Sequence, residues 1–279
     1  MANYTAADIK SLREKTGAGM LDVKKALDEA DGDQEKALEI IRVKGLKGVA
    51  KREGRTVAEG LVAAEVVSEG DGETGVIVEV NSETDFVAKN QTFVDFANSV
   101  LAAAVSSGAT DVDALLATEV DGETVQRRLE DIAAALGEKI QVRRLARVSG
   151  EKVSLYLHRT AKDLPPSVGV LVASDSAGAA VARDVAMHIA AYAPTYRTRE
   201  DVPADIVADE RRIAEETARN EGKPEQALPK IIEGRLNGYF KENVLLDQGY
   251  AKEPKRSVGS VVEEAGGTIT DFVRFRVGS

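Results

Sequence analysis

Three acidic residues near the end of an apolar stretch are the first candidates for chemistry in this sequence. Glu79, Glu83 and Asp85 lie within GVIVEVNSETDFVAKN, which covers residues 75–90. Carboxylates that converge can hold a divalent metal, and a bound metal can activate water for hydrolysis. Successive side chains of an extended strand point to opposite faces, however, so this spacing gives no convincing metal pocket. We therefore treat a metal-dependent hydrolase as a weak alternative and predict no metal site and no cofactor.

Histidine is the next candidate, because its ring titrates near neutral pH and also binds metals. The sequence contains two histidines. His188 lies in an apolar helical stretch over residues 179–191, which favours a structural, hydrogen-bonded ring over a ligand or a base. His158 ends a predicted strand over residues 153–158 and faces a loop, so it is the better candidate for a contact residue.

The sequence lacks the motifs that commonly carry covalent or nucleotide chemistry. It has no cysteine, no G-x-x-x-x-G-K-[ST] phosphate loop, no G-x-G-x-x-G that joins a strand to a helix, and no G-x-S-x-G elbow. We therefore predict no catalytic residues and expect that the protein is not an enzyme.

The composition, with 43% hydrophobic and 30% charged residues, is that of a globular protein. No apolar run approaches the roughly 20 residues that a membrane span needs, so we predict no membrane partner. The N-terminal sequence MANYTAADIKSLREK has no apolar signal segment and the chain has no cysteine, which favours a cytoplasmic location. The formal net charge of −10 disfavours direct binding to nucleic acid, because that binding depends on clustered lysine and arginine.

A polar turn after the apolar stretch places an aromatic residue beside a carboxylate. Residues 76–80 alternate as a strand, with valines on one side and Ile77 on the other, which predicts burial on both faces. Such a rigid strand would aim Asp85 and Phe86, and loop residues on rigid scaffolds often carry function, so Phe86 could enter a pocket of another protein. Two structural alternatives stay open and are the commoner outcome on composition alone. Asp85 could cap a helix that starts near Ala88, and Phe86 could fold onto its own core as a hydrophobic staple.

Residues 1–54 form the first predicted domain, a bundle of three short helices. Thr5 and Asp8 fit a capping box at the first helix, and apolar residues recur at helical spacing in two further segments. Residues 42–55 then carry six basic residues, one acidic residue and three glycines. We expect this stretch to be a solvated linker, as is usual for such charge runs.

Residues 55–149 and 150–279 form two copies of one predicted unit. GVIVEVNSETD from residue 75 is echoed by GVLVASDSAG from residue 169, and each is followed by a helix rich in alanine and valine. A preceding strand, and a closing helix with a long strand, complete each copy. The predicted fold class is therefore α+β: a three-helix bundle followed by two duplicated lobes with small antiparallel sheets, placed side by side.

The second copy contains an insert at about residues 203–243. Apolar residues recur at helical spacing on two arms separated by Gly222-Lys223-Pro224, which predicts an antiparallel helical hairpin, or coiled coil. A projecting pair of helices buries its apolar stripe poorly by itself. We expect the hairpin to dock onto its own lobe, a partner or a second copy, so dimerisation through it is considered.

Two ordered motifs carry a family resemblance. LREKTGAGMLDVKKAL at residues 12–27 and TDFVAKN at residues 84–90 resemble the translation elongation factor Ts family. The resemblance extends over essentially the whole chain, including EGR at residues 233–235 and FVRFRVG at residues 272–278. It implies a bundle like a ubiquitin-associated (UBA) domain, and a guanine nucleotide exchange factor whose partner is the GTPase elongation factor Tu in its GDP-bound form.

The resemblance also implies roles for individual residues. In this family the T-D-F-V turn reaches the nucleotide site of the partner and displaces its Mg²⁺, which points to Thr84, Asp85, Phe86 and Val87. Because Mg²⁺ bridges the phosphates to the GTPase, its displacement weakens GDP binding without a covalent step. No catalytic base is then needed.

The remaining contacts implied by the resemblance lie in three places. They are Leu12, Met20 and Leu21 in the bundle, Leu136 and Gly137 before the last strand of the first lobe, and His158. Leu12 and Leu21 could equally be the core of the bundle. Some family members continue past the last strand into a further helical module, and we expect this sequence, which ends at Ser279, to make none of that module's contacts.

A second class of function stays open beside exchange. A non-enzymatic adaptor would use the UBA-like bundle to bind another partner, with the two lobes as a scaffold. The adaptor alternative is weakened because Asp85 and Phe86, the most unusual residues that we expect to be exposed, lie outside the bundle.

Overall fold

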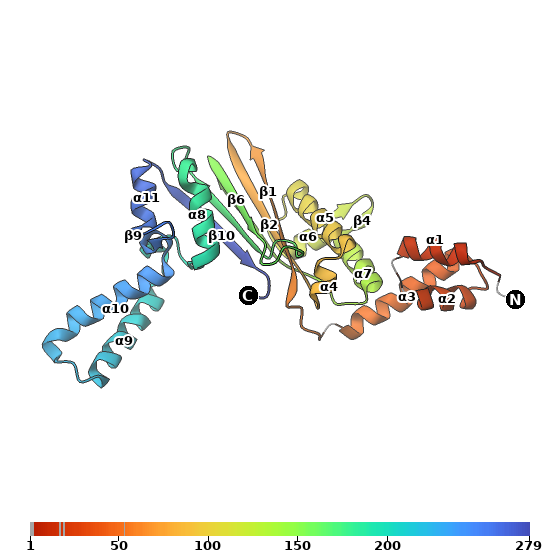
Figure 1. Ribbon diagram of the computed structural model, residues 1–279, viewed down its shortest axis with the longest axis horizontal. Helices are drawn as coiled ribbons and strands as arrows, with labels where there is room; N and C mark the ends of the chain where they lie inside the picture. Colours follow the sequence, from red (N-terminus) through yellow and green to blue (C-terminus); the bar gives the residue numbers. More distant parts are fainter. Residues whose placement is uncertain (1–2, 17, 19, 53) are drawn as a thin grey trace.

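The computed structural model describes residues 3–16, 18, 20–52 and 54–279. It combines helices with small antiparallel sheets, which confirms the predicted α+β class. Figure 1 shows an elongated molecule with the N-terminal bundle at one end, two sheets in the middle and a pair of helices at the other end. The likeness of the bundle to a UBA domain and the predicted domain boundaries stay predictions.

The N-terminal bundle consists of α1 (Ala6–Thr16), α2 (Met20–Glu29) and α3 (Gln34–Arg52). The predicted capping box is present, because the Asp8 amide donates to Thr5 Oγ1 and the Thr5 amide donates to Asp8 Oδ2. Leu12, Val23 and Leu27 are fully buried between the helices. Three amphipathic faces thus meet in one small core.

The expected solvated linker over residues 42–55 is wrong, because α3 continues through most of it to Arg52. The helix lies beside α7 (Val125–Leu136) of the first lobe, and the Arg52 guanidinium donates to the Ala133 carbonyl at 3.3 Å. Each glycine inside a helix costs about 1 kcal/mol relative to alanine, which is why the sequence pattern argued for a linker. Packing against α7 overrides that local preference.

The first lobe contains a three-stranded antiparallel sheet with β2 in the centre. Its strands are β1 (Glu59–Glu69), β2 (Gly72–Ser82) and β5 (Gln141–Gly150). Its helices and short strands are α4 (Asp85–Ala88), α5 (Gln91–Ser107), α6 (Val112–Ala117), β3 (Glu119–Val120), β4 (Glu123–Thr124) and α7. Val76, Val78 and Val80 pack towards α5 and α7, and Ile77 lies in the other cluster, so β2 is buried on both faces as predicted.

The second lobe repeats this order with β7 in the centre of its sheet. Its strands are β6 (Lys152–His158), β7 (Val168–Ser174) and β10 (Ile269–Arg276). Helices α8 (Ala179–Tyr192) and α11 (Val258–Glu264) pack on its outer face, together with the short strands β8 (Gly249–Tyr250) and β9 (Glu253–Ser257). Both lobes therefore place helices on one face of a three-stranded sheet.

The two sheets pack face to face, a detail that the predicted side-by-side placement of the lobes left open. The contact is reciprocal between the copies: a Cβ on Gly75 would lie 2.8 Å from Leu171, and a Cβ on Gly169 would lie 2.9 Å from Ile77. Each glycine thus makes room for the aliphatic residue two positions after the other glycine. Because both inner faces are apolar, closing them on each other removes more surface from water than an edge contact would.

The insert forms α9 (Ala204–Asn220) and α10 (Leu228–Asn243), which project from the second lobe (Figure 1). The short 3₁₀ turns Arg199–Asp201, Glu225–Ala227 and Leu245–Asp247 flank them. The two helices bury Ala214, Ala218, Leu228, Ile232 and Leu236 against each other. The hairpin therefore buries much of its own stripe, contrary to the expectation that it would need another surface.

Candidate functional site

The turn after β2 is fixed by a cap on a very short helix. Thr84 is the N-cap of α4, and its Oγ1 accepts from the Val87 amide at 3.4 Å. The Ser82 hydroxyl donates to the Thr84 carbonyl at 3.0 Å. Asp85 is the first residue of α4 and Asn90 caps the following helix α5, so the alternative that Asp85 caps a helix near Ala88 is wrong.

The turn separates buried from exposed residues. Val87 and Ala88 belong to the core of the first lobe, whereas the Phe86 side chain is 73% exposed. Phe86 therefore does not fold onto its own core, and the hydrophobic-staple alternative is wrong. A large aromatic ring held in water is an unfavourable arrangement for an isolated chain and suits a contact with another molecule.

Lys89 lies over the exposed ring. Its Nζ is 4.7 Å from the centre of the Phe86 ring, 3.7 Å from Asp85 Oδ2 and 3.9 Å from Asp163 Oδ2. The cation therefore restrains the ring and the Asp85 carboxylate together. Asp163 belongs to the loop between β6 and β7, so the second lobe reaches the same surface.

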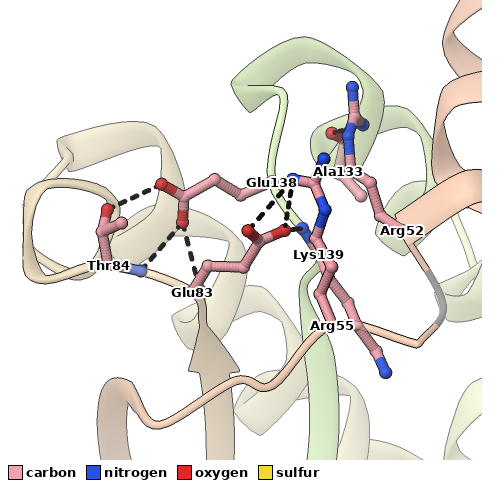
Figure 2. A network of polar contacts seen from close by, with 7 residues as sticks. All are labelled: Arg52, Arg55, Glu83, Thr84, Ala133, Glu138 and Lys139. Atoms are coloured by element: carbon pink, nitrogen blue, oxygen red, sulfur yellow. Dashed lines mark hydrogen bonds and ion pairs between the residues drawn. The ribbon is translucent and has the colours of Figure 1, made fainter.

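The carboxylates of Glu83 and Glu138 join the turn to the segment that enters β5 (Figure 2). Glu138 Oε1 accepts from the Thr84 hydroxyl at 2.6 Å, and its Oε2 accepts from the amides of Glu83 and Thr84 at 3.1 and 3.0 Å. In return, Glu83 Oε1 accepts from the Lys139 amide at 2.6 Å. We call this set of Glu83, Thr84, Glu138 and Lys139 the carboxylate clasp.

Basic residues after the bundle reach the same place. Arg55 Nη1 lies 3.2 and 3.1 Å from the two carboxylate oxygens of Glu83 (Figure 2). Burial raises the pKa of the Glu83 carboxyl, but the Lys139 amide and the charges of Arg55 and Arg52 outweigh it. The pKa of Glu83 therefore lies below its ordinary value, and the carboxylate is charged at neutral pH.

The acidic trio considered for a metal does not converge. Glu79 is completely buried, where it accepts from Arg144 Nε at 2.7 Å and from the side-chain Nδ2 of Asn81 at 3.0 Å. Glu83 is bound in the clasp and Asp85 faces Lys89. Within the described ranges, no group of three or more acidic or histidine residues could hold a metal ion. The geometry required by the hydrolase alternative is therefore missing.

The bundle presents two of its three candidate contact residues. Met20 and Leu21 are 61% and 65% exposed, whereas Leu12 is 1% exposed in the core. The alternative that these leucines form the bundle core is thus confirmed for Leu12 and wrong for Leu21. Because Leu12 is buried, it can support the α2 surface but not supply a side chain to it.

A groove of about 510 Å³ lies between the bundle and the first lobe. Its walls come from α2, α3 and the end of α7, and they include Leu136 and Gly137. Gly137 is the C-cap of α7 with a φ of 76°, a conformation that glycine adopts without strain. Leu136 is half-buried against the lobe core, whereas Gly137 is exposed and no atom lies within 4 Å of the place that a Cβ would take.

The two histidines lie in different environments. His158 is exposed at the end of β6, where its Nδ1 lies 3.1 Å from the Tyr156 hydroxyl. His188 is completely buried; its Nδ1 accepts from the Ala251 amide at 3.2 Å and its Nε2 lies 2.8 Å from Gln248 Oε1. Burial lowers the pKa of His188, so its ring is neutral and fully hydrogen-bonded. The prediction of a structural His188 is confirmed.

Sequence reasoning missed Glu138, Lys139 and Lys89 as parts of this site. Lys89 lies within the TDFVAKN motif, four residues after Asp85, a spacing that brings side chains together on a helix. Glu138 directly follows Leu136-Gly137, so its position next to two candidate residues was the available signal. Its partner is 54 residues away, and no local pattern indicates that pairing.

Comparison with known proteins assigns this fold and site to a class. A family model described as "Elongation factor TS" matches residues 83–279, which is more than half of the chain. Proteins named "Elongation factor Ts" from Beutenbergia cavernae, Renibacterium salmoninarum and Micrococcus luteus are 69%, 65% and 64% identical to it, over 100% of both chains in each case. The class is therefore that of the translation elongation factors. Within that class, the chain belongs to the elongation factor Ts family.

Each helix of the described residues is too short or too polar to cross a membrane.

Proposed function

We propose that this protein binds elongation factor Tu in its GDP-bound form and accelerates the release of GDP. The observation that carries the proposal is the 73% exposed Phe86, which stands on a turn whose neighbouring residues are buried, capped and hydrogen-bonded. A ring presented in this way can enter a pocket of the partner without first being ordered.

The proposed mechanism acts through Thr84, Asp85, Phe86 and Val87. Phe86 and Asp85 reach the partner, whereas Thr84 caps α4 and Val87 anchors it in the core. Moving the groups that position the partner's Mg²⁺ weakens the binding of GDP, because the metal bridges the phosphates to the GTPase. By reciprocity, GDP weakens the binding of this protein to the GTPase by the same factor. Once GDP has left, GTP can bind at the empty nucleotide site.

Three further surfaces are proposed as partner contacts. Met20 and Leu21 offer exposed apolar side chains on α2, and the Gly137 backbone offers a close approach beside Leu136. His158 lies at the end of β6 in the second lobe. Leu12 would contribute indirectly, by holding α2 in place from the bundle core.

The proposal needs no reaction on the protein itself. Displacement of an ion and a nucleotide breaks no covalent bond, so we propose that the protein is not an enzyme and uses no cofactor. Its partner is a protein of the translation apparatus, which suits a cytoplasmic location without direct contact to nucleic acid or membrane. The net charge of −10 agrees with a protein partner and not with a phosphate backbone.

The test is the release rate of a fluorescent GDP from elongation factor Tu. The wild-type chain should accelerate release, and Phe86→Ala should reduce the acceleration by about tenfold or more, equivalent to about 1.4 kcal/mol. Asp85→Ala should reduce it as well, because it removes the charge beside the ring. Circular dichroism should show that both variants keep the wild-type fold, since both side chains face solvent.

Met187→Ala is the matched control, because Met187 is an exposed apolar residue on α8, outside the proposed surfaces. It should accelerate release as the wild type does. An acceleration that survives both turn variants would place the mechanism elsewhere. No acceleration by the wild type would overturn the exchange proposal and favour the adaptor alternative, with Met20 and Leu21 as its binding surface.

A further inference from the structure

We infer that Glu138 is a positioning residue that fixes the exposed turn from behind, so that Asp85 and Phe86 are presented in one orientation. Glu138 itself does not touch the partner in this inference; it acts through the backbone of residues 83 and 84. The inference rests on the proposed function and adds a residue outside the T-D-F-V turn to its machinery.

The Glu138 side chain alone makes three hydrogen bonds to the turn. The Glu138 carboxylate accepts hydrogen bonds from the backbone amides of Glu83 and Thr84 at 3.1 and 3.0 Å, and from the Thr84 hydroxyl at 2.6 Å (Figure 2). Hydrogen bonds to a charged acceptor are roughly twice as strong as neutral ones. Three of them converge on the two residues that directly precede Asp85.

Helix α4 cannot fix its own orientation. It has only four residues, so a single turn is all that its backbone hydrogen bonds can hold. Its N-cap bond from the Val87 amide to Thr84 Oγ1 is long, at 3.4 Å. The same Oγ1 donates to Glu138 at 2.6 Å, so Glu138 holds the capping hydroxyl in place.

The Glu83 carboxylate makes the reciprocal bond. Glu83 accepts from the Lys139 amide at 2.6 Å while its own amide donates to Glu138, so the two chain segments are joined in both directions. Gly137, with its φ of 76°, reverses the chain after α7 and brings Glu138 to the turn. The glycine is therefore needed for the clasp as well as for any approach of a partner.

Basic residues at the end of the bundle also reach this part of the first lobe. Arg55 binds the Glu83 carboxylate and Arg52 donates to the Ala133 carbonyl of α7 (Figure 2). The clasp therefore lies where the end of the bundle, the α7–β5 loop and the turn meet. Loss of Glu138 would free the turn from this framework without removing any side chain proposed to touch the partner.

The experiment compares Glu138→Ala with Glu138→Gln in the full chain. Alanine removes all three bonds, whereas glutamine keeps an oxygen for the two amides and a donor for the Thr84 hydroxyl. Glu138→Ala should lower the maximal rate of fluorescent GDP release about tenfold, with less than a threefold change in the half-saturating concentration. Glu138→Gln should restore the rate to within about threefold of wild type. Glu119→Ala, at an exposed position of β3, is the matched control and should leave the rate unchanged.

Two further readouts separate positioning from a general structural role. In a background that carries both Asp85→Ala and Phe86→Ala, Glu138→Ala should lower the rate further by less than about twofold, because its effect passes through these two side chains. Hydrogen–deuterium exchange of the free chain should show faster exchange at residues 83–88 in Glu138→Ala, with the sheet strands unchanged. This measurement needs no partner, so it tests the clasp even if the wild-type chain does not accelerate GDP release.

Wild-type acceleration with an unaffected rate in a folded Glu138→Ala variant would overturn the inference and leave the proposed function standing. A further loss of more than about twofold in that background, or unchanged exchange at residues 83–88, would also overturn it. Should Glu138→Ala lose the wild-type circular dichroism spectrum, Glu138→Asp retracts the carboxylate by one methylene and provides the same comparison.

Discussion

Hydrogen bonds to a carboxylate fix the start of the exposed turn, and burial of its apolar residues fixes its end. Val87 and Ala88 are buried and anchor α4 in the core. The Glu138 carboxylate accepts from the amides of Glu83 and Thr84, which joins these residues to the segment entering β5. Between these anchors, Asp85 and Phe86 are left to solvent, with Lys89 across both. A residue exposed on a turn fixed at both ends loses little conformational entropy on binding.

The charge of Glu83 gives a pH-dependent prediction. The pKa of this carboxyl is lower in the folded chain than its reference value of 4.5, so its contribution to stability is present above that value and is lost as pH falls through the lower folded pKa. Glu83→Gln removes this contribution. The difference in urea midpoint between wild type and variant should therefore be constant from about pH 6 upward and should shrink below about pH 4.5. A difference that stays constant down to pH 3.5 would contradict this account.

At the scale of elements, α9 and α10 form a hairpin with a small core of their own. The prediction of two helical arms with an apolar stripe matches the positions of Ala214, Leu228, Ile232 and Leu236 in that core. The expectation that the hairpin buries its apolar stripe poorly by itself is wrong, because the two helices cover each other's apolar residues. Ile213 is the one large apolar residue of the described hairpin that is largely exposed, at 46%.

Dimerisation through the hairpin stays a prediction, and Ile213 is where it can be tested. We predict that a contact between two copies uses Ile213, because burying its side chain would remove apolar surface from water. Ile213→Glu would place a charge in that contact and should lower the dimer fraction measured by light scattering across a concentration series. Met187→Glu, on α8, is the matched control. A dimer that resists Ile213→Glu would contradict contact at this position, and a monomer at all concentrations would contradict dimerisation itself.

At the scale of the whole molecule, the two sheets depend on a pair of glycines. A Cβ on Gly169 would lie 2.5 Å from Val62 Cγ1 and 2.9 Å from Ile77 Cδ1, and both neighbours are completely or almost completely buried. The interior is close-packed, so the neighbours have little room to move. The sheet-to-sheet contact therefore fixes how the first lobe, which carries the turn, sits against the second.

Gly169→Ala should destabilise the chain by about 1–3 kcal/mol, because it overfills this contact. Gly238→Ala is the matched control, since Gly238 lies in α10 with no atom within 4 Å of an added Cβ. The control should be stabilised by up to about 1 kcal/mol through higher helix propensity. Urea denaturation measures both. Equal midpoints for Gly169→Ala and wild type would show that the sheets separate easily enough to admit a methyl group.

Much of the architecture could be predicted because it depends on neighbours in the sequence. Alternation of valines with Ile77 predicted a strand buried on both faces, and Thr5 with Asp8 predicted the first capping box. The apolar surroundings of His188 predicted its structural role. Strand and helix periodicities and caps act within about four residues, so the sequence displays them directly.

The sequence by itself determined the α+β class, the repeated order of elements and the motif that carries Asp85 and Phe86. Only the tertiary structure decided that the sheets pack face to face, that α3 continues to Arg52, and that Leu12 is buried while Leu21 is exposed. The bond between Thr84 and Glu138 joins residues 54 apart. Such contacts depend on how separate elements come together in space, and the local sequence pattern is compatible with several of those arrangements.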